Sequence, residues 1–261
     1  MMSDMIHLPI WTIIAAAGMV AIAAIVSLLL RLRLEKDMIV GTLRAFVQLM
    51  AVGLILDWIF KLDRWYLITA WLLLMIGIAA YNAMRRQGKR IPGLTQRFIL
   101  AIGLSSFISI LLGIGLIIRP TPFWDPQYII PIGGMIIGNA MASAALSVNR
   151  LFSEMKNRAG EIEAALSLGS NAYSASLPAM RAAVKSGMMH IISTTMVVGL
   201  VHLPGMMTGQ IVGGIEPSEA VRYQLVIMYI LIATTALSSL LSTLLICKLY
   251  FDERSHMILP E

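Results

Sequence analysis

The chain has 261 residues, of which 58% are hydrophobic and only 13% are charged, and its mean hydropathy is +0.82. An ordinary soluble domain is about 45–50% apolar and about 25% charged, so this chain has too little polar surface to cover a globule in water. The composition also excludes a disordered chain and, with a single cysteine, a disulfide-stapled fold. It predicts an integral membrane protein.

Seven segments have the length of a transmembrane helix, which needs roughly 20 residues to cross about 30 Å of hydrocarbon. Six of them carry no charge, namely 9–30, 65–84, 98–118, 126–149, 186–215 and 223–247. The seventh, 38–60, is interrupted only by Arg44 and Asp57 near its ends. We therefore predict an all-α, polytopic membrane protein with about seven transmembrane helices, in a single transmembrane domain over residues 1–261.

The first span is expected to be retained, because no basic residue precedes it and Arg31 and Arg33 follow it, which is the reverse of the charge order in a signal peptide. Lysine and arginine in the loops then set the orientation. If the N-terminus lies outside, four basic residues lie in outer loops: Lys61, Arg64, Arg119 and Arg222. The cytoplasmic side receives Arg31, Arg33, Lys36, Arg85, Arg86, Lys89, Arg90, Arg97, Arg150, Lys156, Arg158, Arg181, Lys185, Lys248 and Arg254. This bias predicts an N-out, C-in protein of the cell membrane.

The longest loop, 150–185, falls on the cytoplasmic side between the fifth and sixth spans. Within it, Glu161–Leu168 is typical of a short helix with acidic residues in its first turn, where the helix dipole favours them. Gly169 can take the left-handed position that ends such a helix, and Ser170 or Asn171 can cap the next one. Ala164 and Ala165 leave one side thin, so that a partner can close around it. We expect a helix–break–helix elbow, although a plain alanine-rich linker would have a similar composition.

The string Glu163-Ala164-Ala165-x-x-x-Gly169 resembles the EAA loop of ABC-transporter permease subunits, which docks in a cleft of the ATP-binding subunit. A Leu-Pro pair follows the glycine in that pattern, and here Leu177-Pro178 comes several residues early. The resemblance implies that Glu161, Glu163, Ala164, Ala165 and Gly169 couple this chain to an ATPase.

Other strings are similar to the FetB-type permeases, a small family of iron-export permeases that is related to plant aluminium-tolerance permeases. These strings are Arg44-x-x-x-Gln48-Leu49, Gly138-Asn139-Ala140-Met141, Leu203-Pro204-Gly205-Met206-Met207-Thr208-Gly209-Gln210-Ile211 and Val221-Arg222-Tyr223-Gln224. The resemblance implies a transport protein in which two copies of the permease work with two separate ATP-binding subunits. It also implies export of a metal ion, iron by resemblance, or of a small solute.

Polar side chains inside the spans are costly and usually face a cavity or another helix. Arg44 and Gln48 lie one helical turn apart and could line a path, or Arg44 could extend to the inner headgroups. Asn139, Ser143 and Ser147 recur every four residues, which fits either helix packing or the lining of a route. The candidate route residues are Arg44, Gln48, Asn139, Met141, Met196, Met206, Met207 and Gln210.

Gly205, Gly209 and Gly213 also recur every four residues, and Pro204 prevents an uninterrupted helix before them. We expect a broken or re-entrant element there that packs closely or forms an outer gate, so the span count could drop to six. The 19 methionines could offer thioethers to soft ions or fill gaps between helices. Iron is therefore implied by the resemblance and not by the side chains.

The sequence contains no G-x-x-x-x-G-K-[ST] phosphate loop, no metal-ligand spacing among its four histidines and no nucleophile motif. We thus expect no catalytic or cofactor-binding residues in this chain, no role as an enzyme and no nucleic-acid partner, and we assign no metal ligands. ATP would be used by the partner subunit. The alternative is an ATPase-independent secondary transporter, although the middles of the spans lack the acidic or histidine relay that proton coupling usually needs.

Overall fold

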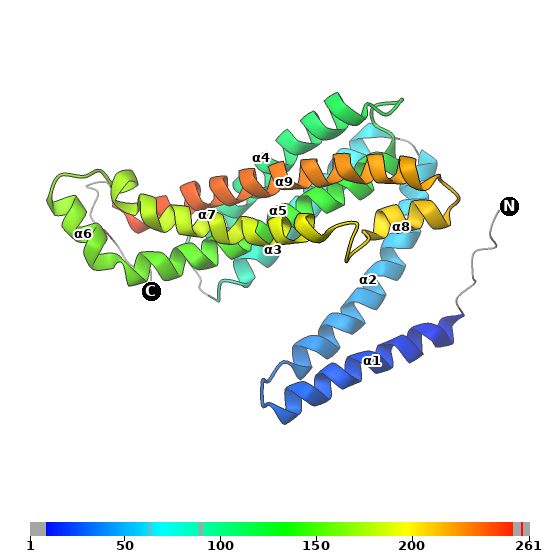
Figure 1. Ribbon diagram of the computed structural model, residues 1–261, viewed down its shortest axis with the longest axis horizontal. Coiled ribbons are helices and arrows are strands. Elements are labelled where there is room, and N and C mark those ends of the chain that lie inside the picture. The colour runs from blue at the N-terminus through cyan, green and yellow to red at the C-terminus, as the bar shows by residue number, and fades with distance from the viewer. Residues whose placement is uncertain (1–8, 63, 89–90, 253–256, 258–261) are drawn as a thin grey trace. The chain divides into compact units, whose positions relative to one another are not determined.

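The structure is a computed structural model that describes residues 9–62, 64–88, 91–252 and 257, and nearly all of them are helical (Figure 1). Within these residues the extended pairing is limited to two isolated bridges, between Val198 and His202 and between Phe251 and Met257. The chain divides into two compact units, one of residues 1–64 with 212–214 and one of residues 65–211 with 215–261. Each unit is described by itself.

The first unit contains α1 (Ile10–Leu29) and α2 (Glu35–Leu62), which are joined by a tight turn. The Ser27 hydroxyl fixes this turn because it donates to Glu35 Oε2 at 2.7 Å and accepts from the Leu34 amide at 3.0 Å. Glu35 and Asp37 occupy the first turn of α2, where the positive end of the helix dipole favours carboxylates. Most described side chains of both helices are exposed and apolar, as expected for helices that meet lipid or other helices.

The second unit is a bundle built around α5. Its elements are α3 (Trp65–Arg85), α4 (Leu94–Ile110) with a π-helical extension (Leu111–Ile118), α5 (Pro126–Asn157), α6 (Ala159–Ser167), α7 (Ala172–Val197), α8 (Gly205–Val212) and α9 (Pro217–Cys247) with a final 3₁₀ turn (Lys248–Tyr250). Helix α5 packs against α3, α4, α7 and α9, and α9 also packs against α4 and α7 (Figure 1).

Small side chains allow these helices to approach closely. The buried core of the second unit is rich in alanine and isoleucine, and the buried face of α9 carries a run of hydroxyl residues, namely Thr234, Thr235, Ser238, Ser239, Ser242 and Thr243. Several of these hydroxyls bond to a helical carbonyl, as Ser238 does to the Ala140 oxygen of α5 at 2.8 Å. Such side chains favour close helix–helix packing in membranes.

Six helical segments in the described part of the chain are long and apolar enough to cross a membrane: α1, α2, α3, α4 with its extension, α5 and α9. The predicted span 186–215 differs, because it is not one helix. Helix α7 begins much earlier, at Ala172, and ends at Val197, and a break over residues 198–204 separates it from the short α8. The break ends at Pro204, where the sequence predicted an interruption. The polytopic all-α fold is confirmed, whereas the seventh span and the orientation stay predictions.

Candidate functional site

The predicted elbow is present between α5 and α7, where α6 forms a separate short helix (Figure 1). Gly169 follows α6 with φ of +91°, a left-handed backbone conformation that glycine adopts at little cost. Asn171 then caps α7, because its Oδ1 accepts from the Ser174 amide at 2.7 Å. The glycine break and the asparagine cap were both predicted, and they fix the turn between the two helices.

One face of α6 anchors the elbow and the opposite face is free. Ile162 is buried and Leu166 packs against the core of the bundle, so these two residues, one turn apart, hold α6 to the rest of the unit. Glu163 and Ala164 are exposed, and Leu168 at the tip is 88% exposed. The elbow thus exposes both a carboxylate and an apolar side chain, which a partner protein could cover.

A charged clamp that the sequence analysis did not identify holds the junction of α5 and α6. The Glu154 carboxylate is almost buried, and it contacts Arg150 Nη2 at 2.5 Å and Arg158 Nε at 2.7 Å. Arg158 lies between the two helices, also contacts Glu161 at 3.4 Å, and has its pKa raised mainly by its hydrogen bond to Glu154. The spacing Arg150, Glu154, Arg158 at four-residue intervals is the sequence signal that could have revealed it.

The predicted elbow residues share one segment but differ in exposure. Glu161 and Glu163 are exposed, as are Ala164 and Gly169, while Ala165 is half-buried. Glu161 is engaged with Arg158, whereas Glu163 has no side-chain partner among the residues that the structure describes. Glu163 is therefore the acidic residue of the elbow that is available to another protein.

The predicted route residues do not form one site within a single unit. Arg44 and Gln48 are exposed on α2 of the first unit, and the others belong to the second unit. Asn139 on α5 is half-buried and donates to the Met135 carbonyl at 2.9 Å, Met141 is half-buried, and Met196 near the end of α7 is 76% exposed. Met206, Met207 and Gln210 are half-buried on α8. Their role in transport stays a prediction.

The described residues contain no group of three or more histidine, cysteine, aspartate or glutamate side chains that could hold a metal ion. Gly205 and Gly209 have open space where a side chain would lie, and Gly213 falls in the segment that belongs to the first unit. Open space at two glycines one turn apart leaves room for another helix to approach. Their gate or packing role stays a prediction.

Three helices approach one another closely at Gly187 of α7, a contact that the sequence analysis also missed. A Cβ atom at this position would overlap Ser147 Oγ of α5 and Ser239 Oγ of α9, and would lie 2.9 Å from the Ser143 carbonyl oxygen. Ser143 and Ser147 thus belong to a packing interface, one of the two interpretations of the polar stripe on α5. No local pattern marks Gly187, because the contact needs residues about 40 and 50 positions away.

Comparison with known proteins identifies relatives over almost the whole chain. Residues 10–251 match the family described as "Uncharacterised protein family (UPF0014)". The chain is 38% identical to UPF0014 membrane protein YjkA of Bacillus subtilis over 226 residues, which cover 87% of this chain and 89% of that protein. It is 32% identical to Probable iron export permease protein FetB of Escherichia coli, with 94% of this chain and 93% of that protein covered.

A plant relative extends the similarity, since the chain is 33% identical to Protein ALUMINUM SENSITIVE 3 of Arabidopsis thaliana, with 92% of this chain and 86% of that protein covered. No solved structure matches the chain. The resemblance to the FetB-type permeases is thereby confirmed, and the membrane helices agree with the names of the relatives. The chain belongs to the UPF0014 family of membrane proteins and is a multi-pass member of it.

Proposed function

We propose that this chain is the permease subunit of an ABC-type transporter that exports a metal ion or a small solute from the cytoplasm. The observation that carries the proposal is the elbow, in which α6 is anchored by Ile162 and presents Glu163, Ala164 and Leu168 outward. This arrangement suits a coupling helix that sits in a cleft of an ATP-binding subunit. Iron is the leading cargo, because a relative is named as a probable iron export permease.

The proposed mechanism is alternating access driven by the partner. Two copies of this chain would pair with two ATP-binding subunits, and closure of the ATPase dimer would push on the elbow from Glu161 to Gly169. The clamp at Glu154 joins α6 to the end of α5, so a displacement of α6 would be passed to the central helix of the bundle. ATP hydrolysis would belong to the partner, and this chain would form no covalent bond and hold no cofactor.

The test is co-purification of the full chain from detergent with the candidate ATP-binding subunit. The wild type should form a complex with ATPase activity. Glu163→Lys should lose the complex because it reverses the charge of the free acidic residue, and Gly169→Pro should lose it because proline cannot adopt a φ of +91°. Gly160→Ala is the matched control, since Gly160 lies on α6 with a helical backbone and open space where the added Cβ would lie. The complex should persist in this variant.

Two outcomes would contradict the proposal. If the folded wild type captures no ATP-binding subunit, the secondary transporter becomes the better account and the EAA-like string is coincidental. If Glu163→Lys and Gly169→Pro keep both the complex and its transport-coupled ATPase activity, the elbow does not couple the two proteins.

A further inference from the structure

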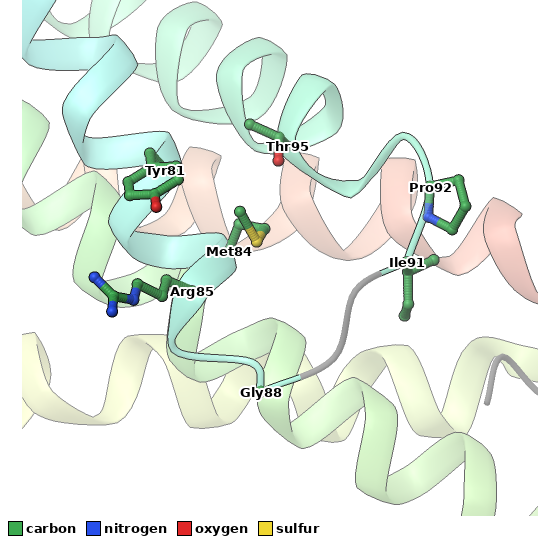
Figure 2. Close-up of a pocket in the computed structure, with 7 residues that line it drawn as sticks. All are labelled: Tyr81, Met84, Arg85, Gly88, Ile91, Pro92 and Thr95. Carbon is green, nitrogen blue, oxygen red and sulfur yellow. The ribbon is translucent and has the colours of Figure 1, made fainter.

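A cleft lies between the end of α3 and the start of α4, and none of its residues belongs to the elbow. It has a volume of about 700 Å³, which falls in the range of about 300–1,000 Å³ that ligand pockets occupy. Figure 2 shows Tyr81, Met84 and Arg85 on α3, Thr95 at the start of α4, and Ile91 and Pro92 on the loop before it. Gly88 also lines the cleft.

The walls of the cleft are held by contacts with the rest of the bundle. Gln87 Nε2 donates to the carbonyls of Ala83 and Ala145, which ties the end of α3 to α5. Arg97 on the first turns of α4 donates to the Leu245 carbonyl of α9. The Arg85 side chain, in contrast, has no hydrogen-bond or ion-pair partner in the part of the chain that the structure covers, and it is exposed. The cleft therefore combines anchored walls with a free guanidinium group.

The local charge is strongly positive. Residues 85–90 contain Arg85, Arg86, Lys89 and Arg90, and no aspartate or glutamate occurs anywhere from residue 65 to residue 124. Neither α3 nor α4 can thus neutralise these charges with a carboxylate of its own. A cluster of four or more basic residues directly beside a transmembrane helix is typical of segments that bind anionic lipid.

The side chains leading to the cleft are ordered as a phospholipid would require. Leu74, Ile78, Tyr81 and Arg85 follow one another along one side of α3, and each of the first three is about half exposed. This order runs from aliphatic side chains at membrane depth, through an aromatic ring of the kind that is enriched at headgroup level, to a cation at the surface. A soluble anion would use only the last part of this path, whereas a lipid would use all of it.

We propose that this cleft binds the headgroup of an anionic phospholipid, with Arg85 at its phosphate and the acyl chains along Leu74 and Ile78. The ligand class is a glycerophospholipid with net negative charge. The binding would hold the α3–α4 turn at the membrane surface, on the side that the distribution of basic residues predicts to be cytoplasmic.

The test is native mass spectrometry of the full chain with added phosphatidylglycerol or phosphatidylcholine. We expect the wild type to retain phosphatidylglycerol preferentially and Arg85→Gln to weaken that binding about fivefold, which is the effect of one basic residue near an anionic surface. Arg86→Gln is the matched control, because it removes the same charge one residue away at an exposed position outside the cleft lining. It should weaken binding less than Arg85→Gln does, because Arg86 adds to the local positive charge without lining the cleft.

Three results would overturn the proposal. Equal retention of both lipids would show that the site does not recognise negative charge. An equal loss in Arg86→Gln would assign the effect to the charge of the loop and not to the cleft. Displacement of the lipid by inorganic phosphate at the same concentration would show that the acyl path contributes nothing and that the ligand is a free anion.

Discussion

The packing of the bundle leaves no room for a side chain at Gly187. Gly187→Ala would place a methyl group against Ser147 and Ser239, so the three helices must separate or the serines must shift. Overpacking of this kind typically costs about 1–3 kcal/mol of the free energy of unfolding. Gly138→Ala on α5 is the control, because open space surrounds that glycine and alanine favours a helix.

Cys247 supplies the measurement for this pair of variants. It is buried and is the only cysteine of the chain, so a thiol-reactive dye reports its exposure as the protein unfolds in detergent. Gly187→Ala should react at a lower temperature than the wild type, and Gly138→Ala should react at the same temperature or a higher one. A wild-type melting temperature for Gly187→Ala would show that the helices tolerate the methyl group.

Glu154 is the second residue with a specific expected effect. Glu154→Gln removes the negative charge that Arg150 and Arg158 share, while it keeps the shape of the side chain. We expect a loss of about 1–2 kcal/mol in the free energy of unfolding, since hydrogen bonds to charged groups contribute about this much. Glu161→Gln, at an exposed position with a single longer contact, should change it by less than about 0.5 kcal/mol. Thermal unfolding in detergent would check both, and equal melting temperatures would contradict the clamp.

At the scale of the elements, the apolar runs predicted most helices because a fixed bilayer thickness imposes a fixed length. Gly169 and Asn171 predicted the elbow because their conformational preferences are local. The sequence analysis expected a helix after Asn171 and a separate span from residue 186. It did not predict that they form one helix, α7, since Arg181 and Lys185 end the apolar run without ending the helix. The contact at Gly187 was out of reach for a different reason, because it depends on how three helices approach one another.

The exposed side chain of Leu168 allows a test of whether the partner contacts the tip of the elbow. If a partner covers the tip, Leu168→Asp should weaken capture of the ATP-binding subunit at least tenfold, because burial of a full leucine side chain is worth about 1.5–3 kcal/mol. The fold should be unaffected, since Leu168 is 88% exposed and contributes little to the core. Capture would be measured by titration of the purified subunit onto the immobilised permease. Wild-type affinity in this variant, with an unchanged melting temperature, would remove Leu168 from the contact.

At the scale of the whole molecule, the predicted orientation in the membrane rests on the distribution of lysine and arginine, and labelling of single cysteines tests it. Two variants would be made in a Cys247→Ser background, Ser218→Cys in the first turn of α9 and Leu168→Cys at the elbow. Both positions are exposed. An impermeant maleimide added to intact cells should label Ser218→Cys, and it should label Leu168→Cys only after the cells are permeabilised. The reverse pattern would contradict the N-out, C-in arrangement.

The most direct test of the coupling elbow is photo-cross-linking in intact membranes. A benzophenone amino acid would replace Leu168 at the tip of the elbow and, as the control, Leu146, which is exposed on α5 in a transmembrane segment. Our account predicts that position 168 cross-links to a protein that contains an ATP-binding phosphate loop, and that position 146 does not. A cross-link to that ATPase from position 146 but not from position 168, or from neither position, would contradict the assignment of the elbow as the contact that powers transport.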